Sequence, residues 1–141
     1  MTQVFFYHGA SDKLAAACAL ISGTYAKKKS ILVYAPDSAI ADGIDRLLWT
    51  NAQLSFIPHC RVDSPLASET PILIAGEMPA QPTQNERLMN LGRDIPPGFS
   101  RFQSLVEVVG QDEGDRLAAR DRVKSYREQG YEVQYFDLSN R

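Results

Sequence analysis

Short apolar runs alternate along this chain with longer amphipathic segments, and this alternation is the feature that most restricts its fold. Each run is closed by Gly or Pro, a pattern typical of buried strands. The apolar runs are residues 4–8, 30–35, 71–76 and 104–109, and an alternating stretch at 131–138 follows them. Because strands that alternate with helices form parallel sheets through right-handed crossovers, we predict a Rossmann-like α/β fold. Its sheet should be open and mostly parallel, with helices on both faces, in one domain spanning residues 1–141.

Three helices are predicted from apolar spacing and from residues suited to helix ends. Ser11 and Asp12 can begin the first helix by accepting an N–H of its first turn. The last helix should extend from Asp112 to Gln129 and end at Gly130, which readily adopts the left-handed stop conformation. The apolar positions expected to face the core from the first two helices are Leu14, Cys18, Ile21, Tyr25, Ile40, Ile44, Leu47 and Leu48.

Composition excludes several classes of protein. The 141 residues carry a net charge of −2 at pH 7, so nucleic acid could bind only at a local basic patch. Cys18 and Cys60 have neither the spacing of a zinc site nor that of a disulfide framework, which suits a reducing cytoplasm. No apolar run is long enough to span a membrane, and the N-terminus lacks a signal-peptide pattern. We therefore expect a cytoplasmic protein without a metal, a cofactor or a membrane segment.

The first strand-to-helix turn, residues 8–12, is where a doubly wound sheet often binds a nucleotide. It contains one Gly, not the Gly-rich fingerprint, and no phosphate-binding loop motif occurs elsewhere. His8 and Asp12 leave open the alternative of a small nucleotide- or phosphate-binding enzyme. His59 and Cys60 are adjacent loop residues that do not resemble a metal site. Because no nucleophile, base and orienting group can be assembled, we predict no catalytic activity.

The last predicted helix carries a stripe of positive charge. Its cations recur at intervals of three and four residues, within about 80° of one another around the helix axis. They are Arg116, Arg120, Lys124 and Arg127, and the apolar Ala119, Val123 and Tyr126 lie alongside. Pairing of Asp112 with Arg116 would explain only part of the stripe. Like charges four residues apart repel each other, so we expect an acidic partner to offset that cost. The apolar neighbours favour an acidic peptide, and without aromatic stacking residues direct DNA binding should be slight.

The connection at residues 50–70 is long and shows no clear periodicity. It follows Trp49, the only tryptophan, and it contains Phe56, Ile57 and Pro58 in a segment too short for a central strand. Two interpretations remain open at this point. The aromatic residues either cover the core or form a docking patch, since aromatic anchors dominate many interfaces.

Several ordered segments resemble the chi subunit of bacterial DNA polymerase III. The most specific are DRLLW followed by SFIPH, and the basic ending AARDRVKSYREQGYEV. Further segments in the same order are FYH, DKLAAACAL, VYAPD, RLMNLG and PPGFSRF. The resemblance covers almost the whole chain and implies a Rossmann-like protein without chemistry of its own.

The resemblance also implies partners. Members of this family pair with the psi subunit of the clamp loader and bind the acidic C-terminal tail of single-stranded DNA-binding protein, which ends in Pro-Phe. The expected psi site contains Trp49 and Phe56, with Ile57 and Pro58 beside them. The expected tail site is Arg116, Arg120 and Lys124, extended by Val123 and Arg127 of the same stripe. An XPD-like helicase is a further possible partner. Our hypothesis is a non-catalytic accessory subunit of the replisome that links psi to the tail.

Overall fold

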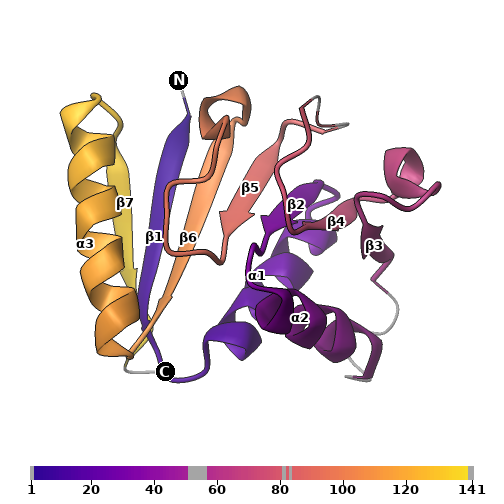
Figure 1. The fold of residues 1–141 in the computed structure, drawn as a ribbon, viewed down its shortest axis with the longest axis horizontal. Coiled ribbons are helices and arrows are strands. Elements are labelled where there is room, and N and C mark those ends of the chain that lie inside the picture. Colours follow the sequence, from indigo (N-terminus) through magenta and orange to yellow (C-terminus); the bar gives the residue numbers. More distant parts are fainter. Residues whose placement is uncertain (1, 51–56, 81, 83, 140–141) are drawn as a thin grey trace.

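The structure is a computed structural model that describes residues 2–50, 57–80, 82 and 84–139. Within these residues, seven parallel strands form one sheet in the order β3-β4-β2-β5-β6-β1-β7 (Figure 1). The strands are β1 (Gln3–Ala10), β2 (Ile31–Tyr34), β3 (His59–Arg61), β4 (Ile72–Ala75), β5 (Arg87–Asn90), β6 (Ser104–Gly110) and β7 (Val133–Asp137). The helices are α1 (Lys13–Ala26), α2 (Ser38–Thr50) and α3 (Glu113–Glu128), with short 3-10 turns at Ala67–Glu69 and Phe99–Arg101.

The five predicted strands and three predicted helices are confirmed. The sequence pattern predicts neither β3 nor β5. β3 lies within the connection at residues 50–70, for which the sequence shows no clear periodicity. β3 has three residues and β5 has four, which is too short for an apolar period to stand out. Each is held in place by pairing: His59 lies opposite Ile72 of β4, and Leu88 lies opposite Leu32 of β2.

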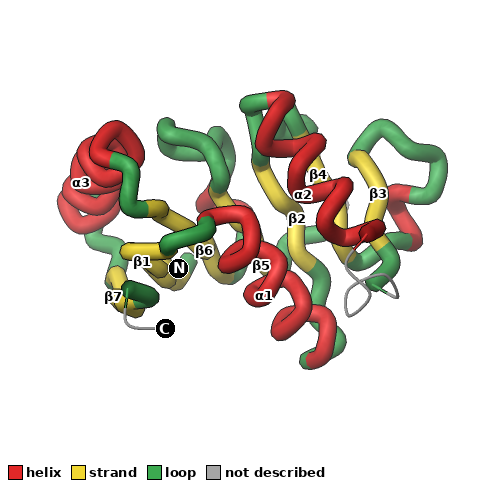
Figure 2. Tube along the Cα trace, turned by 90° about the horizontal axis from the view of Figure 1, so that it is seen from below, coloured by secondary structure: helices red, strands yellow, loops and turns green. Residues whose placement is uncertain are grey.

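The helices cover both faces of the sheet, as predicted (Figure 2). Alternate residues of each strand point to opposite faces of the sheet. The strands therefore contribute side chains to two hydrophobic cores, one on each face. One core packs α1 and α2 against residues such as Val33 and Ile74. Tyr126 of α3 lies with Val4 and Leu105 in a core on the opposite face. None of the described helices is long and apolar enough to cross a membrane.

Aspartates begin the helices and a glycine ends the last one. The carboxylate of Asp12, not the Ser11 hydroxyl, accepts the Ala15 N–H at 3.1 Å and begins α1. Asp112 accepts the Asp115 N–H at 3.0 Å and begins α3. Gly130 has φ of 90°, in the left-handed region, and follows the end of α3 as the sequence predicts.

Candidate functional site

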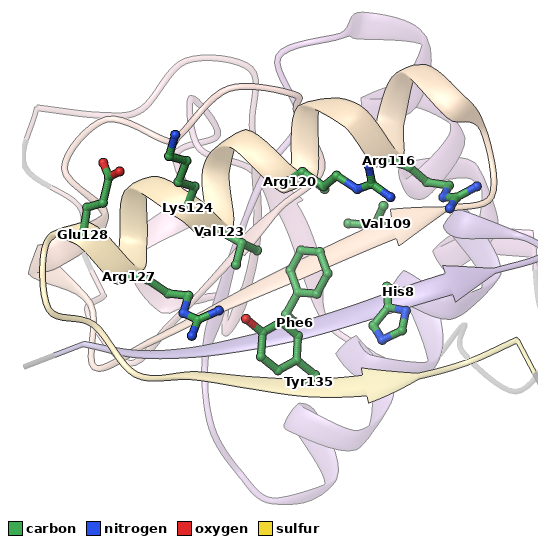
Figure 3. Close-up of a pocket in the computed structure, with 11 residues that line it drawn as sticks. Phe6, His8, Val109, Arg116, Arg120, Val123, Lys124, Arg127, Glu128 and Tyr135 are labelled. Carbon is green, nitrogen blue, oxygen red and sulfur yellow. The ribbon is translucent and has the colours of Figure 1, made fainter.

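A groove of about 690 Å³ lies between α3 and the strands β1 and β7 (Figure 3). The cation stripe and Val123 of α3 all line this groove, so the structure brings together the five residues predicted for the tail site. We call it the basic groove. Its lining residues are Phe6, His8, Val109, Arg116, Ala119, Arg120, Val123, Lys124, Arg127, Glu128 and Tyr135.

The floor of the basic groove is apolar and aromatic. Phe6 is 8% exposed and packs with Val109 and Ala119 under α3. The Tyr135 ring meets Phe6 edge-on, with 5.8 Å between centroids, and His8 stacks on the other side of Phe6, also at 5.8 Å. Half of the Tyr135 surface remains exposed. The groove therefore offers an aromatic slot into which a ring or an aliphatic side chain can pack. The expectation that aromatic residues are missing beside the cation stripe is wrong, because β1 and β7 supply them.

The rim of the basic groove carries positive charge that the described residues do not neutralise. The four cations are exposed, and no described carboxylate lies within ion-pair distance of any of them. Asp112 pairs with Arg93 at 3.0 Å, so the considered pairing of Asp112 with Arg116 is wrong. Among the described residues that line the groove, only Glu128 is acidic, and it points away from the sheet (Figure 3). The rim is thus complementary to an anionic partner.

The opposite side of α3 holds a buried polar cluster. Arg122 is 3% exposed, and its guanidinium contacts the fully buried Glu107 carboxylate through Nε and Nη2, each at 3.1 Å. Tyr126 and Asn90 also donate to Glu107. Burial raises the pKa of Glu107, whereas Arg122 and the two other donors oppose that rise. Tyr126 belongs to this cluster and is fully buried, so the expectation that it lies alongside the stripe is wrong.

The cation stripe read from the sequence predicts only the residues that α3 contributes to the groove. The residues that the sheet contributes were not predicted. Phe6 and His8 come from β1, Val109 from β6 and Tyr135 from β7 (Figure 3). His8, interpreted from sequence as a structural histidine, stacks on Phe6 and forms part of the groove wall. The alternating pattern of residues 131–138 could have put Tyr135 on one face of its strand, but only the pairing of β7 with β1 places it beside Phe6.

The residues predicted to bind psi differ in their exposure to solvent. Trp49 is 60% exposed at the end of α2, and Pro58 is also exposed. Ile57 is 7% exposed and packs in the core under α1 and α2, so its side chain does not join the exposed surface. Phe56 lies outside the described residues. The Trp49 ring packs against the His59 ring at 4.7 Å, and His59 in turn lies 3.3 Å from Asp45.

The carboxyl edge of the sheet, which the alternative of a nucleotide-binding enzyme requires, forms a separate cleft of about 540 Å³. The charged side chains around this cleft already form hydrogen bonds and ion pairs within the protein. Asp12, Asp37 and Asp112 each accept an N–H of the helix that they precede. Lys13 pairs with Asp115 at 3.1 Å, and Asp115 also accepts the Gly110 N–H. A phosphate would have to displace these carboxylates, which argues against that alternative.

His59 and Cys60 do not form part of a metal site in the described structure. Among the described residues, no group of three His, Cys, Asp or Glu side chains could hold a metal ion. His59 is instead engaged with Asp45 and the Ile57 carbonyl, 2.9 Å from its Nδ1. Cys18 is buried in the core, and that burial raises the pKa of its thiol to about 11. The contacts of His59 and the burial of Cys18 therefore indicate a role in the fold.

Comparison with known proteins shows the family of the chain. A family model described as "DNA polymerase III chi subunit, HolC" matches residues 1–134. The chain belongs to this family. The match includes Trp49 and every lining residue of the basic groove except Tyr135, which follows its last residue.

Three chi subunits illustrate the extent of the similarity. The chain is 31% identical over 139 residues to DNA polymerase III subunit chi of Pseudomonas aeruginosa, covering 95% of each protein. It is 28% identical to the subunit of Haemophilus influenzae, covering 83% of this chain and 81% of that one. For Escherichia coli the identity is 23%, over 82% and 79%. Membership of the chi family supports an accessory role in DNA replication and agrees with the prediction of no catalytic activity.

Proposed function

We propose that this chi-family protein links the psi subunit of the clamp loader to the acidic C-terminal tail of single-stranded DNA-binding protein, in the cytoplasm at the replisome. The observation that carries the proposal is the basic groove. Its rim has four exposed cations without a described ion-pair partner, and its floor has an aromatic slot. An acidic peptide that ends in an aromatic residue matches this combination, because charge and ring are recognised side by side.

The peptide would bind through two kinds of contact. Its Asp carboxylates accept charge-assisted hydrogen bonds from the guanidinium groups of Arg116, Arg120 and Arg127. Its terminal Phe ring packs against Phe6 and Val123. At this exposed rim each ionic contact should contribute on the order of 1 kcal/mol. Binding should also weaken as salt is added, because charges at the surface are screened over about 8–10 Å near physiological ionic strength.

Substitution of Arg120 tests the proposed tail site. We expect Arg120→Ala to lower the affinity for an acidic peptide ending in Pro-Phe several-fold, as measured by calorimetric titration. Arg46→Ala is the matched control, because Arg46 is also an exposed helical arginine but lies on α2, away from the groove. An unchanged affinity of Arg120→Ala, or an equal loss in Arg46→Ala, would contradict the proposed site.

The exposed Trp49 ring supports the second half of the proposal. A tryptophan that packs on one side against His59 and leaves 60% of its surface exposed offers a large apolar area for docking, which favours an interface role. We place psi here, on a surface formed by Trp49 and Pro58, and keep Phe56 as a sequence-based member. Trp49 packs against His59 of the edge strand β3, whereas the basic groove lies beside β1 and β7. Because β3 and β7 are the two opposite edges of the sheet, the two partners can bind together (Figure 1).

Co-purification with psi tests this surface. We expect Trp49→Ala to lose psi at moderate salt while keeping its affinity for the acidic peptide, and Phe56→Ala to behave in the same way. Leu117→Ala is the control, since Leu117 is another exposed large apolar residue, 51% exposed, on α3. Retention of psi by both aromatic variants would return these residues to a structural role.

A further inference from the structure

Within the described part of the chain, strand β7 forms an open edge of the sheet. It pairs with β1 on its inner side, where Val4 N donates to Glu132 O at 3.3 Å and Leu138 N donates to His8 O at 2.8 Å. In a parallel pair, alternate residues of a strand bond to the same neighbour. The even-numbered residues from Glu132 to Leu138 therefore face β1. The N–H and C=O groups of Val133, Tyr135 and Asp137 point outward, and no described strand pairs with them.

The two edges of the sheet differ in how they are protected. The far edge strand, β3, has only three residues, follows Pro58, and carries Arg61 in an ion pair with Asp42 at 2.8 Å. Short length, proline and charge are common means of blocking unwanted strand pairing. β7 has five residues and contains neither Pro, Lys nor Arg; its one charged residue, Asp137, lies at its C-terminal end and accepts hydrogen bonds from Ser139. An unblocked edge of this length is suited to accept an additional strand.

The open edge and the basic groove share a residue. The Tyr135 side chain lines the groove. Its backbone N–H and C=O point away from β1, past the open edge of the sheet. Figure 3 shows α3 and β7 on either side of Phe6 and Tyr135, with Arg127 and Arg116 toward opposite ends of the groove. A peptide that extends along β7 therefore remains beside the cations of α3 throughout its length.

We infer that the acidic peptide adds to the open edge of β7 as an eighth strand while its side chains contact the basic groove. This inference rests on the proposed function and adds that the peptide binds as an extended β-strand. Charge selects this occupant over a second copy of the chain. Pairing of two β7 strands would bring two sets of uncompensated cations together, whereas the acidic peptide neutralises one set. Main-chain bonds would supply affinity, and the cations and the aromatic slot would supply specificity.

Amide hydrogen exchange measured by NMR tests the inference directly. On titration with an unmodified acidic peptide ending in Pro-Phe, exchange at Val133 and Tyr135 should slow by about tenfold or more. Gln134 and Phe136 are internal controls, because their amides already face β1. Exchange at the outward amides that is unaffected by bound peptide would overturn strand addition and leave the proposed function intact.

Backbone methylation of the peptide provides an independent measurement. Two peptides of identical sequence, N-methylated at every second residue in opposite registers, should differ several-fold in affinity, because only one register removes N–H donors that face β7. Equal affinities for the two peptides would overturn the inference. A lack of binding by the unmodified peptide would overturn the proposed function as well. Concentration-dependent protection of Tyr135 in the free chain would assign the edge to a second copy instead.

Discussion

Helix α3 carries arginines in two opposite situations. Arg122 is buried and bonded to Glu107 on the side that faces the sheet core. Arg116, Arg120 and Arg127 are exposed along the basic groove, without a described carboxylate partner. The same residue type therefore fixes the helix on one side and leaves charge available on the other. This comparison separates cations that stabilise the fold from cations that are available to a ligand.

The buried arginine links several elements. Besides Glu107 of β6, Arg122 Nη1 donates to the Arg93 carbonyl at 2.7 Å, in the loop after β5. The Arg93 side chain in turn pairs with Asp112, the residue that begins α3. The position and rotation of α3 are thus set from its middle and from its start. This fixed rotation keeps Arg116, Arg120 and Arg127 along the groove, whereas Lys124 points away from the sheet (Figure 3).

Loss of the buried pair should have the largest effect. We expect Arg122→Met to lower the free energy of unfolding by about 3–5 kcal/mol, because Glu107 would remain buried without a counter-charge. Urea denaturation measures this change. The additional substitution Glu107→Gln should recover much of the loss, since it removes the charge but retains an acceptor for Tyr126. Arg120→Met is the matched control and should change stability by less than about 0.5 kcal/mol. Equal losses in the Arg122 and Arg120 variants would remove the distinction between the two sets.

A smaller, pH-dependent effect should accompany that loss. Burial raises the pKa of Glu107, and Arg122 opposes the rise, so Arg122→Met should raise it further. A carboxyl whose pKa is higher in the folded state binds protons there more tightly than in the unfolded chain, so stability falls as pH rises. The defect of Arg122→Met should therefore be smaller near about pH 5 than near about pH 8. Urea midpoints across this range measure it, and a pH-independent defect, or the same slope in Arg122→Met/Glu107→Gln, would contradict the assignment.

A negative charge introduced into the groove should affect binding more than stability. Val123→Asp places a carboxylate beside the aromatic slot, and we expect it to weaken binding of the acidic peptide by about tenfold, or about 1.4 kcal/mol. Leu117→Asp makes the same change on an exposed part of α3 that does not line the groove. Calorimetric titration of the two variants, after their folding is checked by urea denaturation, gives the comparison. Similar losses in both would show that net charge, not the groove, determines binding.

Local patterns in the sequence predict most of the secondary structure. Apolar runs, the Asp residues that begin α1 and α3, and Gly130 act within a few residues of their own position, so each can be identified in isolation. The cation stripe is also local, because its geometry depends only on the helix repeat. β3 and β5 could not be predicted, since strands of three and four residues depend on pairing with β4 and β2.

The remainder of the candidate site depends on contacts between distant segments. Phe6 and Tyr135 meet because β7 adds beside β1, and no local pattern specifies that strand order. The different role of Arg122 has a partial signal in the sequence. It falls at helical spacing from Ala119 and Tyr126, which face the core, and Glu107 interrupts an apolar run. A buried acid and a core-facing arginine together could have indicated an internal ion pair.

The most direct test of the basic groove is a titration of the intact chain with two acidic peptides that differ only by the terminal Phe. Burial of a Phe ring in an apolar slot contributes about 1.5–3 kcal/mol. We therefore predict that removal of this residue lowers the affinity by about tenfold or more. Equal affinities for the two peptides would show that the cations of α3 recognise charge alone and that Phe6, Val123 and Tyr135 do not form a recognition slot.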